Sequence, residues 1–184
     1  MLDKYHQQYA NKTNEELVKR IAEKEKELVF INASVKPEFN SSTLDIAVMG
    51  CGDSRFVKGH KLIFEKVFEK PAIIKTFDIR IDHLMGENDV YQHDCTLPLP
   101  FGLYDITFAH VLLRFISKEK QWTLVKNSYD SLKNGGIAIH VLDPEDYENT
   151  NSVDFSNIMS ELYRNGIRYT MVDLPIGQAV VLQK

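Results

Sequence analysis

The chain has 184 residues, enough for one domain with a full-sized hydrophobic core and too few for two. Its apolar content of 43% and charged content of 26% are ordinary for a globular protein, and its net charge of −4 argues against binding of long nucleic acids. No apolar run is long enough to cross a membrane, and the N-terminal sequence MLDKYHQQYANKTNEE lacks the apolar stretch of a secretory signal. We therefore expect a single cytoplasmic domain whose two cysteines, Cys51 and Cys95, lie outside any metal-binding spacing.

The first 43 residues are expected to form a helical cap. Residues 13–29 are predicted to be an amphipathic helix that begins with a capping box of Thr13 and Glu16. Residues 32–43, which contain Pro37 and several Asn and Ser residues, are predicted to be a loop. We expect the helix either to cover a bound ligand as a lid or to pack on the rest of the domain. Its apolar residues at helical spacing are Leu17, Ile21 and Leu28. The residues ahead of it that would join a lid are Tyr5, His6 and Tyr9.

The remaining residues, 44–184, repeat the order strand, turn, helix. Short apolar runs predict strands at residues 44–49, 72–77, 89–93, 104–109, 137–142, 168–173 and 178–182. Helices are predicted at 56–68, 117–133 and 154–164, the second closed by Asn134-Gly135-Gly136. The last two strands are too close in sequence for a parallel crossover. We therefore predict an α/β fold with a seven-stranded, mainly parallel, doubly wound sheet, a C-terminal antiparallel hairpin, and helices on both faces.

Three successive predicted strands end in residues that suit nucleotide binding. The first ends at Gly50-Cys51-Gly52, where glycines permit a tight turn and a close approach of a ligand to the backbone. Asp78 ends the second strand and could accept hydrogen bonds from both ribose hydroxyls, or could cap the short helix after it. Asp94 ends the third and could accept from the exocyclic amine of adenine, or could be an ordinary turn residue. Together, the three strand ends indicate a nucleotide site.

Residues 44–142 resemble class I S-adenosylmethionine (SAM)-dependent methyltransferases, and the final hairpin extends the resemblance to residue 184. Gly50-Cys51-Gly52-Asp53-Ser54 is similar to the family's glycine-rich motif, and Thr76-Phe77-Asp78-Ile79 to its acidic ribose-binding motif. The later matching stretches are HDCTLPLPF (93–101) for adenine binding, LYDITFAHVL (103–112) for the fourth strand and its exit, and LKNGG (132–136) for the turn before the fifth strand. The resemblance implies methyl transfer from SAM to a small-molecule or protein acceptor, with S-adenosylhomocysteine (SAH) as the product.

The resemblance also implies which residues bind the cofactor. They are Gly50, Cys51, Gly52, Asp78, Ile79, Asp94, Cys95 and His110. Two positions depart from the family pattern: Val48 stands where an acidic residue is usual, and Ser54 replaces the third glycine. Both positions lie near the methionine end of the cofactor in the family, and Asp53 could supply the missing charge.

The sequence holds few signs of acid–base chemistry. Methyl transfer requires few acid or base groups, because alignment of the nucleophile with the methyl group supplies much of the reduction in the barrier. After the fourth strand there is no DPPY or NPPY run, which amino-group methylating members usually have, and no Pro-Cys pair for cytosine methylation. His110 is the catalytic candidate, as a base or positioning donor, or else it caps the next helix or bonds to backbone. His140 and Asp143 show no metal-ligand spacing. Residues 143–148, with Tyr147, are expected to cover the substrate.

Two other classes of function stay open from the sequence. Val48 and Ser54 favour a non-catalytic module that keeps the fold, binds the cofactor weakly and works through a partner protein. Asp78 could instead contact the ribose of a nicotinamide cofactor in an oxidoreductase. Against that alternative, the Gly-x-Gly-x-x-Gly spacing fails, since Arg55 stands three residues after Gly52.

Overall fold

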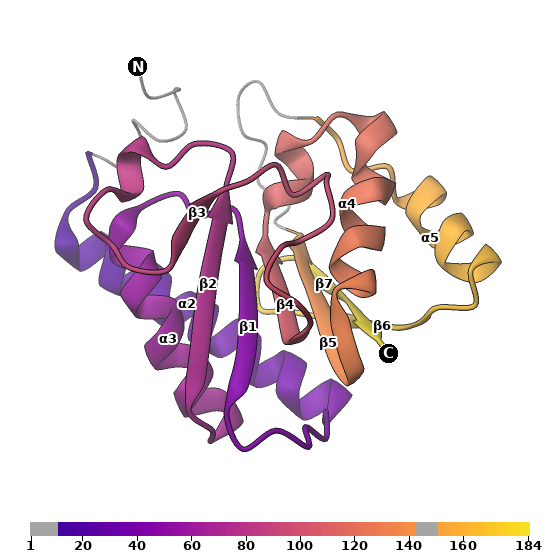
Figure 1. Cartoon of the computed structure of the whole chain (residues 1–184), viewed down its shortest axis with the longest axis horizontal. Coiled ribbons are helices and arrows are strands. Elements are labelled where there is room, and N and C mark those ends of the chain that lie inside the picture. The colour runs from indigo at the N-terminus through magenta and orange to yellow at the C-terminus, as the bar shows by residue number, and fades with distance from the viewer. Residues whose placement is uncertain (1–10, 143–150) are drawn as a thin grey trace.

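The computed structural model describes residues 11–142 and 151–184 (Figure 1). Its elements in chain order are α2 (Asn14–Val35), β1 (Leu44–Met49), α3 (Ser54–Phe68), β2 (Ala72–Asp78), the 3₁₀ helix η1 (Asp82–Leu84), β3 (Val90–Gln92), β4 (Tyr104–His110), the 3₁₀ helix η2 (Leu112–Phe115), α4 (Lys118–Asp130), β5 (Leu132–Leu142), α5 (Phe155–Arg164), β6 (Arg168–Asp173) and β7 (Gln178–Gln183). Each strand predicted from the sequence is present.

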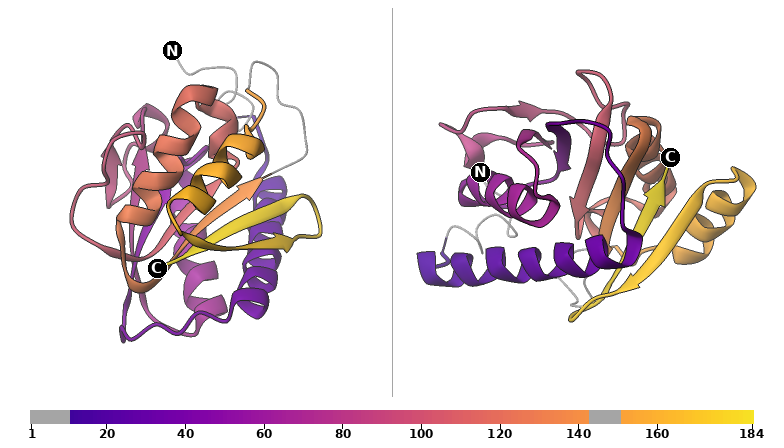
Figure 2. Two further views of the ribbon diagram at one scale, coloured as in Figure 1. Left: turned by 90° about the vertical axis from the view of Figure 1, so that its right-hand side faces the viewer. Right: turned by 90° about the horizontal axis from the view of Figure 1, so that it is seen from below.

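The strands form one seven-stranded sheet in the order β3-β2-β1-β4-β5-β7-β6. Strands β1 to β5 run parallel to one another, whereas β7 runs antiparallel to both β5 and β6. Helices α2 and α3 cover one face of the sheet, and α4 and α5 cover the other (Figure 2). The predicted fold class is therefore confirmed. The direction of winding reverses between β1 and β4, and ligands of such sheets bind beyond the strand ends at this point.

Apolar side chains on the two faces form two separate cores. On one face Leu28 and Ile31 of α2 and Phe64 of α3 pack against the sheet with no exposed surface. On the other face Leu124 of α4 and Leu162 of α5 are also fully buried. Each such side chain stabilises the fold by about 1.5–3 kcal/mol relative to an exposed one. Both layers of helices are therefore held to the sheet by burial.

Helix α2 begins as predicted and ends later than predicted. Thr13 and Glu16 form the capping box, but the helix continues to Val35 instead of ending near residue 29. The extra turns are stabilised by tertiary contacts that no local pattern shows, including a hydrogen bond from the Asn32 side-chain amide to the Val67 carbonyl of α3. No helix in the two described ranges is both long and apolar enough to span a membrane.

The segment 132–136 was expected to be a turn after the predicted helix 117–133, and this expectation is wrong. Helix α4 ends at Asp130, and β5 already begins at Leu132, which pairs with Tyr104 of β4. An irregularity in the β4–β5 pairing follows, where Gly135 has a φ of +82°. A Cβ on Gly136 would lie 2.9 Å from the Asp105 carbonyl oxygen. Gly135 and Gly136 thus form part of a bulge within β5 and do not end a helix.

Candidate functional site

The glycine turn after β1 is held against the end of β2 by backbone hydrogen bonds. The Gly50 N–H donates to the Phe77 carbonyl at 2.8 Å, and the Cys51 N–H donates to Asp78 Oδ2 at 2.8 Å. Gly50 has a φ of +75°, which L side chains rarely adopt, and a Cβ there would lie 3.0 Å from Leu112 Cδ1. A glycine is therefore required where β1, β2 and the exit of β4 meet.

Asp78 lies where the sequence placed it, at the end of β2, and its side chain is fixed in the turn. Its Oδ1 accepts the Arg80 N–H at 3.0 Å, and Oδ2 accepts the Cys51 N–H. The residue is buried, and Ile79 beside it is 63% exposed. Each carboxylate oxygen has two lone pairs, so these bonds leave acceptor capacity for further donors. Asp78 thus both shapes the turn and can bind a ligand hydroxyl.

Asp94 lies beyond β3, close to the end of β2, because the His93 N–H donates to the Asp78 carbonyl at 2.8 Å. Its Oδ1 accepts the Thr96 N–H at 2.9 Å and the Thr96 hydroxyl at 2.8 Å. The backbone hydrogen bond from Thr96 is the main reason that the pKa of Asp94 is lowered. The turn reading of Asp94 therefore holds, while its other oxygen, Oδ2, is on the same edge of the sheet as Asp78. Cys95 next to it is buried.

Both carboxylate oxygens of Asp53 accept hydrogen bonds from Arg55. It caps α3 by accepting the Arg55 N–H at 2.9 Å, and its two oxygens accept Nε and Nη2 of Arg55, each at 2.8 Å. Burial alone would raise the pKa of Asp53, but the bonds from Arg55 outweigh it and lower that pKa. The suggestion that Asp53 replaces the missing acidic residue at Val48 therefore finds no support in its contacts.

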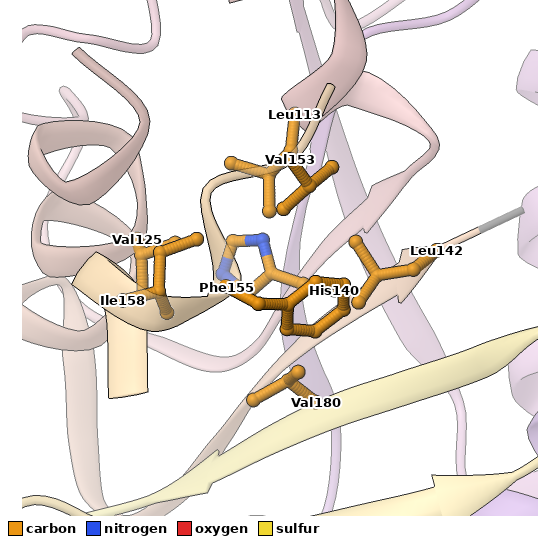
Figure 3. Close-up of a pocket in the computed structure, with 8 residues that line it drawn as sticks. All are labelled: Leu113, Val125, His140, Leu142, Val153, Phe155, Ile158 and Val180. Carbon is orange, nitrogen blue, oxygen red and sulfur yellow. The ribbon is translucent and has the colours of Figure 1, made fainter. Parts of the chain in front are cut away.

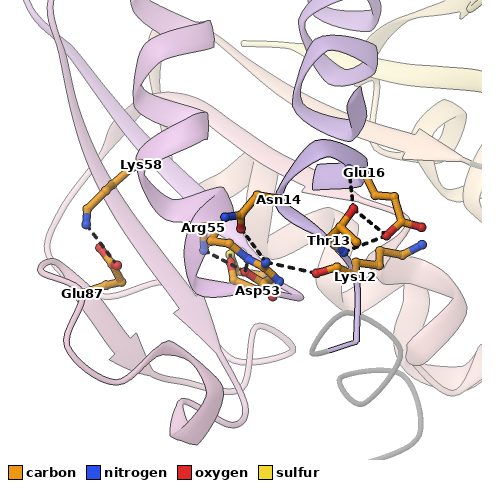
Figure 4. A network of polar contacts seen from close by, with 9 residues as sticks. Lys12, Thr13, Asn14, Glu16, Asp53, Arg55, Lys58 and Glu87 are labelled. Carbon is orange, nitrogen blue, oxygen red and sulfur yellow. Dashed lines mark hydrogen bonds and ion pairs between the residues drawn. The ribbon is translucent and has the colours of Figure 1, made fainter. Parts of the chain in front are cut away.

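Arg55 also joins the glycine turn to the start of α2 (Figure 4). Its Nη1 donates to the Lys12 carbonyl at 3.2 Å and to Asn14 Oδ1 at 3.1 Å. Below these contacts, Leu17 of α2 packs with Cys51 in a small buried cluster. A Cβ on Gly59 of α3 would lie only 2.7 Å from the Ile21 side chain, so the two helices are in close contact. The cap helix therefore packs on the domain and also reaches the glycine turn. Its predicted lid residues Tyr5, His6 and Tyr9 lie outside the described residues.

His110 ends β4 next to the glycine turn, since Ala109 pairs with Met49 of β1. Its Nε2 lies 3.0 Å from Glu27 Oε2 of α2. Val111, which follows, has a φ of +62°. A β-branched residue in that conformation is strained by about 1–3 kcal/mol, and such strain is concentrated at functional sites. Glu27 was missed from the sequence, where it is 83 residues from His110.

His140 lies on the opposite face of the sheet from His110 and does not join it. Its Nε2 is 2.8 Å from Ser128 Oγ of α4, and burial lowers its pKa to about 4. The ring borders a small apolar pocket, which offers about 10 Å³ to the centre of a water molecule (Figure 3). The residues around it are Leu113, Val125, Leu142, Val153, Phe155, Ile158 and Val180. This space is too small for a ligand larger than a water molecule, and its lining is apolar.

Some expectations fall on residues 143–150, which lie outside the described ranges. These are the substrate-covering loop 143–148 with Tyr147, and Asp143 as a neighbour of His140. Among the described residues, no group of three or more His, Cys, Asp or Glu side chains is arranged to hold a metal ion.

No protein-family model matches the sequence, and no curated protein is significantly similar to it. Solved structures match it over most of its length. Magnesium protoporphyrin IX methyltransferase (ChlM) from Synechocystis PCC 6803, with bound SAM, is 14% identical with a TM-score of 0.58, over 94% of this chain and 84% of that one. DesVI from Streptomyces venezuelae is 9% identical with a TM-score of 0.63, over 93% of this chain and 98% of that one. A SAM-dependent methyltransferase from Clostridium acetobutylicum ATCC 824 is 9% identical with a TM-score of 0.63, over 88% of this chain and 90% of that one.

These likenesses, together with the strand order and the terminal hairpin, define the class of fold. The chain has the fold of class I SAM-dependent methyltransferases. The resemblance seen in the sequence is thereby confirmed at the level of the fold.

Proposed function

We propose that this chain is a methyltransferase that binds SAM, transfers its methyl group to a small-molecule acceptor and releases SAH. The observation that carries the proposal is the joining of three strand ends at one edge of the sheet. The Cys51 N–H and the Asp78 carboxylate are bonded at 2.8 Å, and the Asp78 carbonyl accepts from His93 beside Asp94. The turn of β1, the acid of β2 and the acid after β3 therefore form a single surface at the topological switch point.

The residues at this surface fit the cofactor. Gly50 has a φ of +75°, a backbone conformation that residues with a side chain rarely adopt, so the chain can make the tight turn that a nucleotide site at this strand end needs. Asp78 keeps lone pairs for ribose hydroxyls, and the exposed apolar side chain of Ile79 suits the face of an adenine ring. When bound, SAM supplies an electrophilic methyl group. The residues that the family resemblance assigns to cofactor binding would hold or face it: Gly50, Cys51, Gly52, Asp78, Ile79, Asp94, Cys95 and His110.

Two structural neighbours support a small-molecule acceptor. One neighbour acts on magnesium protoporphyrin IX, and another is the sugar N-methyltransferase KedS8 from Streptoalloteichus sp ATCC 53650. We infer an acceptor of this size class from these neighbours, and the net charge of −4 argues against a long nucleic acid. A cytoplasmic location is part of the proposal, since Cys51 and Cys95 are both buried free thiols.

The test is equilibrium dialysis of labelled SAM against the full chain and two matched variants. Asp78→Asn removes the charge of the ribose acceptor while it keeps the side-chain shape, and we expect SAM affinity to fall at least about ten-fold, the loss of one charged hydrogen bond. Asp89→Asn is the control: this residue is exposed at the start of the neighbouring strand, and its variant should bind SAM as the wild type does. Equal SAM binding by both variants would refute the role given to Asp78, and no binding by the wild type would refute the function.

A further inference from the structure

The peptide groups on both sides of Cys51 are held by two side chains that follow one another along the chain. The Cys51 N–H, in the first peptide group, donates to Asp78 Oδ2 at 2.8 Å. The Cys51 carbonyl oxygen, in the second, lies 2.6 Å from His83 Nε2. A carbonyl oxygen accepts hydrogen bonds and cannot donate them, so His83 Nε2 carries a hydrogen and donates it. Asp78 and His83 thus fix two successive peptide planes of the glycine turn.

His83 belongs to η1, the 3₁₀ helix in the crossover between β2 and β3. The crossover is anchored beside the glycine turn, because Leu84 is only 1% exposed and packs in the same small buried cluster as Cys51. Further along the crossover, Glu87 pairs with Lys58 of α3 at 3.4 Å (Figure 4). The Lys58 side chain is 78% exposed, so this ion pair contributes little to the anchoring. The crossover is therefore held to the turn mainly through His83 and Leu84.

The hydrogen bond from His83 also sets the direction of the Gly52 N–H. The peptide between Cys51 and Gly52 is trans, and in a trans peptide the carbonyl and the following N–H point in opposite directions. The Gly52 N–H therefore points away from His83. Cys51 is buried and Gly52 is partly exposed, so the turn meets the surface of the molecule at Gly52. A backbone donor of fixed direction at this point suits a ligand that brings a hydrogen-bond acceptor.

We propose that His83 is a positioning residue for the cofactor, which holds the Cys51 carbonyl so that the Gly52 N–H is set for SAM before SAM binds. This inference rests on the proposed function. Asp78 restrains the first peptide of the turn and keeps lone pairs for the ribose hydroxyls, and His83 restrains the second peptide. A turn that is already fixed in the free protein loses less conformational entropy on binding, and the affinity is higher for that reason. His83 acts through the Cys51 peptide and needs no contact with SAM.

Calorimetric titration of the full chain and three variants with SAH tests this role. His83→Leu has no donor, and we expect its SAH affinity to fall about ten-fold, which corresponds to the loss of one hydrogen bond. His83→Gln places an amide N–H near the position of Nε2, and we expect it to bind SAH within about three-fold of the wild type. Glu87→Gln, on the same crossover, is the matched control and should bind SAH as the wild type does, because its partner Lys58 is exposed. Equal SAH affinity of His83→Leu and His83→Gln would overturn the inference.

The hydrogen bond itself is tested without a ligand by ¹⁵N NMR of the full chain with labelled histidine and glycine. His83→Leu identifies the ring signals of His83 by their loss. We expect a hydrogen on His83 Nε2, and a Gly52 amide signal that shifts in His83→Leu but stays close to the wild-type position in His83→Gln. A His83 ring whose only hydrogen is on Nδ1 would overturn the inference. If the wild type does not bind SAH, the proposed function fails and the role toward the cofactor fails with it, whereas these spectra still show whether His83 fixes the turn.

Discussion

Gly50 is the residue at which backbone conformation and crowding act together. Its φ is +75°, and a Cβ would lie 3.0 Å from Leu112 Cδ1. We predict that Gly50→Ala destabilises the fold by about 1–2 kcal/mol and weakens SAM binding at least about ten-fold, because the turn must shift. Urea unfolding and calorimetric titration measure the two effects. Gly86→Ala is the control, since Gly86 has a φ of +89° with nothing within 4 Å of a Cβ, and it should lose stability but keep SAM affinity. Equal SAM affinity in both variants would contradict the role of the turn.

His60 is buried in the core although neither of its ring nitrogens has a hydrogen-bond partner among residues 11–142 and 151–184. Burial keeps the pKa of His60 well below 6.5. As the pH falls below 6.5, His60 therefore becomes protonated in the unfolded state while it stays neutral in the folded state. Stability should therefore be unaffected by His60 above about pH 7 and fall by up to about 1.4 kcal/mol per pH unit below about pH 6.5. We predict that His60→Phe, which places a ring that cannot ionise between Phe56 and Phe108, removes this share of the acid sensitivity. Urea unfolding at pH 7.5 and 5.5 tests it, and an unchanged difference between the two pH values would contradict it.

Single residues differ in how far the sequence could reveal them. Asp78 and Asp94 were identified because each follows an apolar run that marks a strand end. The sequence could not show that Asp78 also bonds the Cys51 amide, nor that Thr96 holds Asp94. Glu27 was missed because its contact with His110 depends on how α2 crosses the sheet. The available signal was a charge one turn before the buried Ile31, on the packed side of the helix.

At the scale of elements, a group of charged residues ties β1, β4 and β5 together at the ends opposite the candidate site. Lys133 Nζ lies 2.6 Å from Asp45 Oδ2 and 2.8 Å from Asp105 Oδ2, and Ser41 donates to Asp105 at 2.7 Å. Burial alone would raise the pKa of Asp105, but the bonds from Lys133, the Asp45 amide and Ser41 outweigh it and lower that pKa. A lowered pKa means that Asp105 stabilises the fold above about pH 4 and that this contribution is lost as the pH falls further.

We predict that Asp105→Asn destabilises the fold by about 2 kcal/mol at pH 7, because it leaves Lys133 without its more buried carboxylate partner. Asp130→Asn is the matched control, since Asp130 pairs with Lys126 on the exposed side of α4, and it should change stability by less than about 0.5 kcal/mol. Urea unfolding measures both. Equal stability of the two variants would show that the buried group does not hold the three strands.

Element types were easier to predict than element ends. The alternation of strands with helices and the short connection before the last strand were enough for the sheet and its hairpin. Two boundaries were wrong for a physical reason. Contacts with α3 extend α2 to Val35, and pairing with Tyr104 draws Leu132 into β5 although Gly135 and Gly136 follow it. Tertiary contacts of this kind outweigh local propensity, which a sequence pattern cannot show.

At the scale of the whole molecule, the sheet order and hairpin match methyltransferases of 9–14% identity over most of their length. A fold can persist at such identity because burial, spacing and turn geometry are kept while side chains change. The site requires more specific evidence than the fold, and here that evidence is the joined strand ends around Gly50, Asp78 and Asp94. The central claim is therefore that this edge of the sheet binds SAM and not a dinucleotide such as NAD.

Calorimetric titration of the full chain with SAM, SAH and NAD tests that claim most directly. The account predicts micromolar dissociation constants for SAM and SAH, corresponding to about −8 kcal/mol, and no measurable binding of NAD. Absence of binding by both SAM and SAH, or binding of NAD alone, would contradict it.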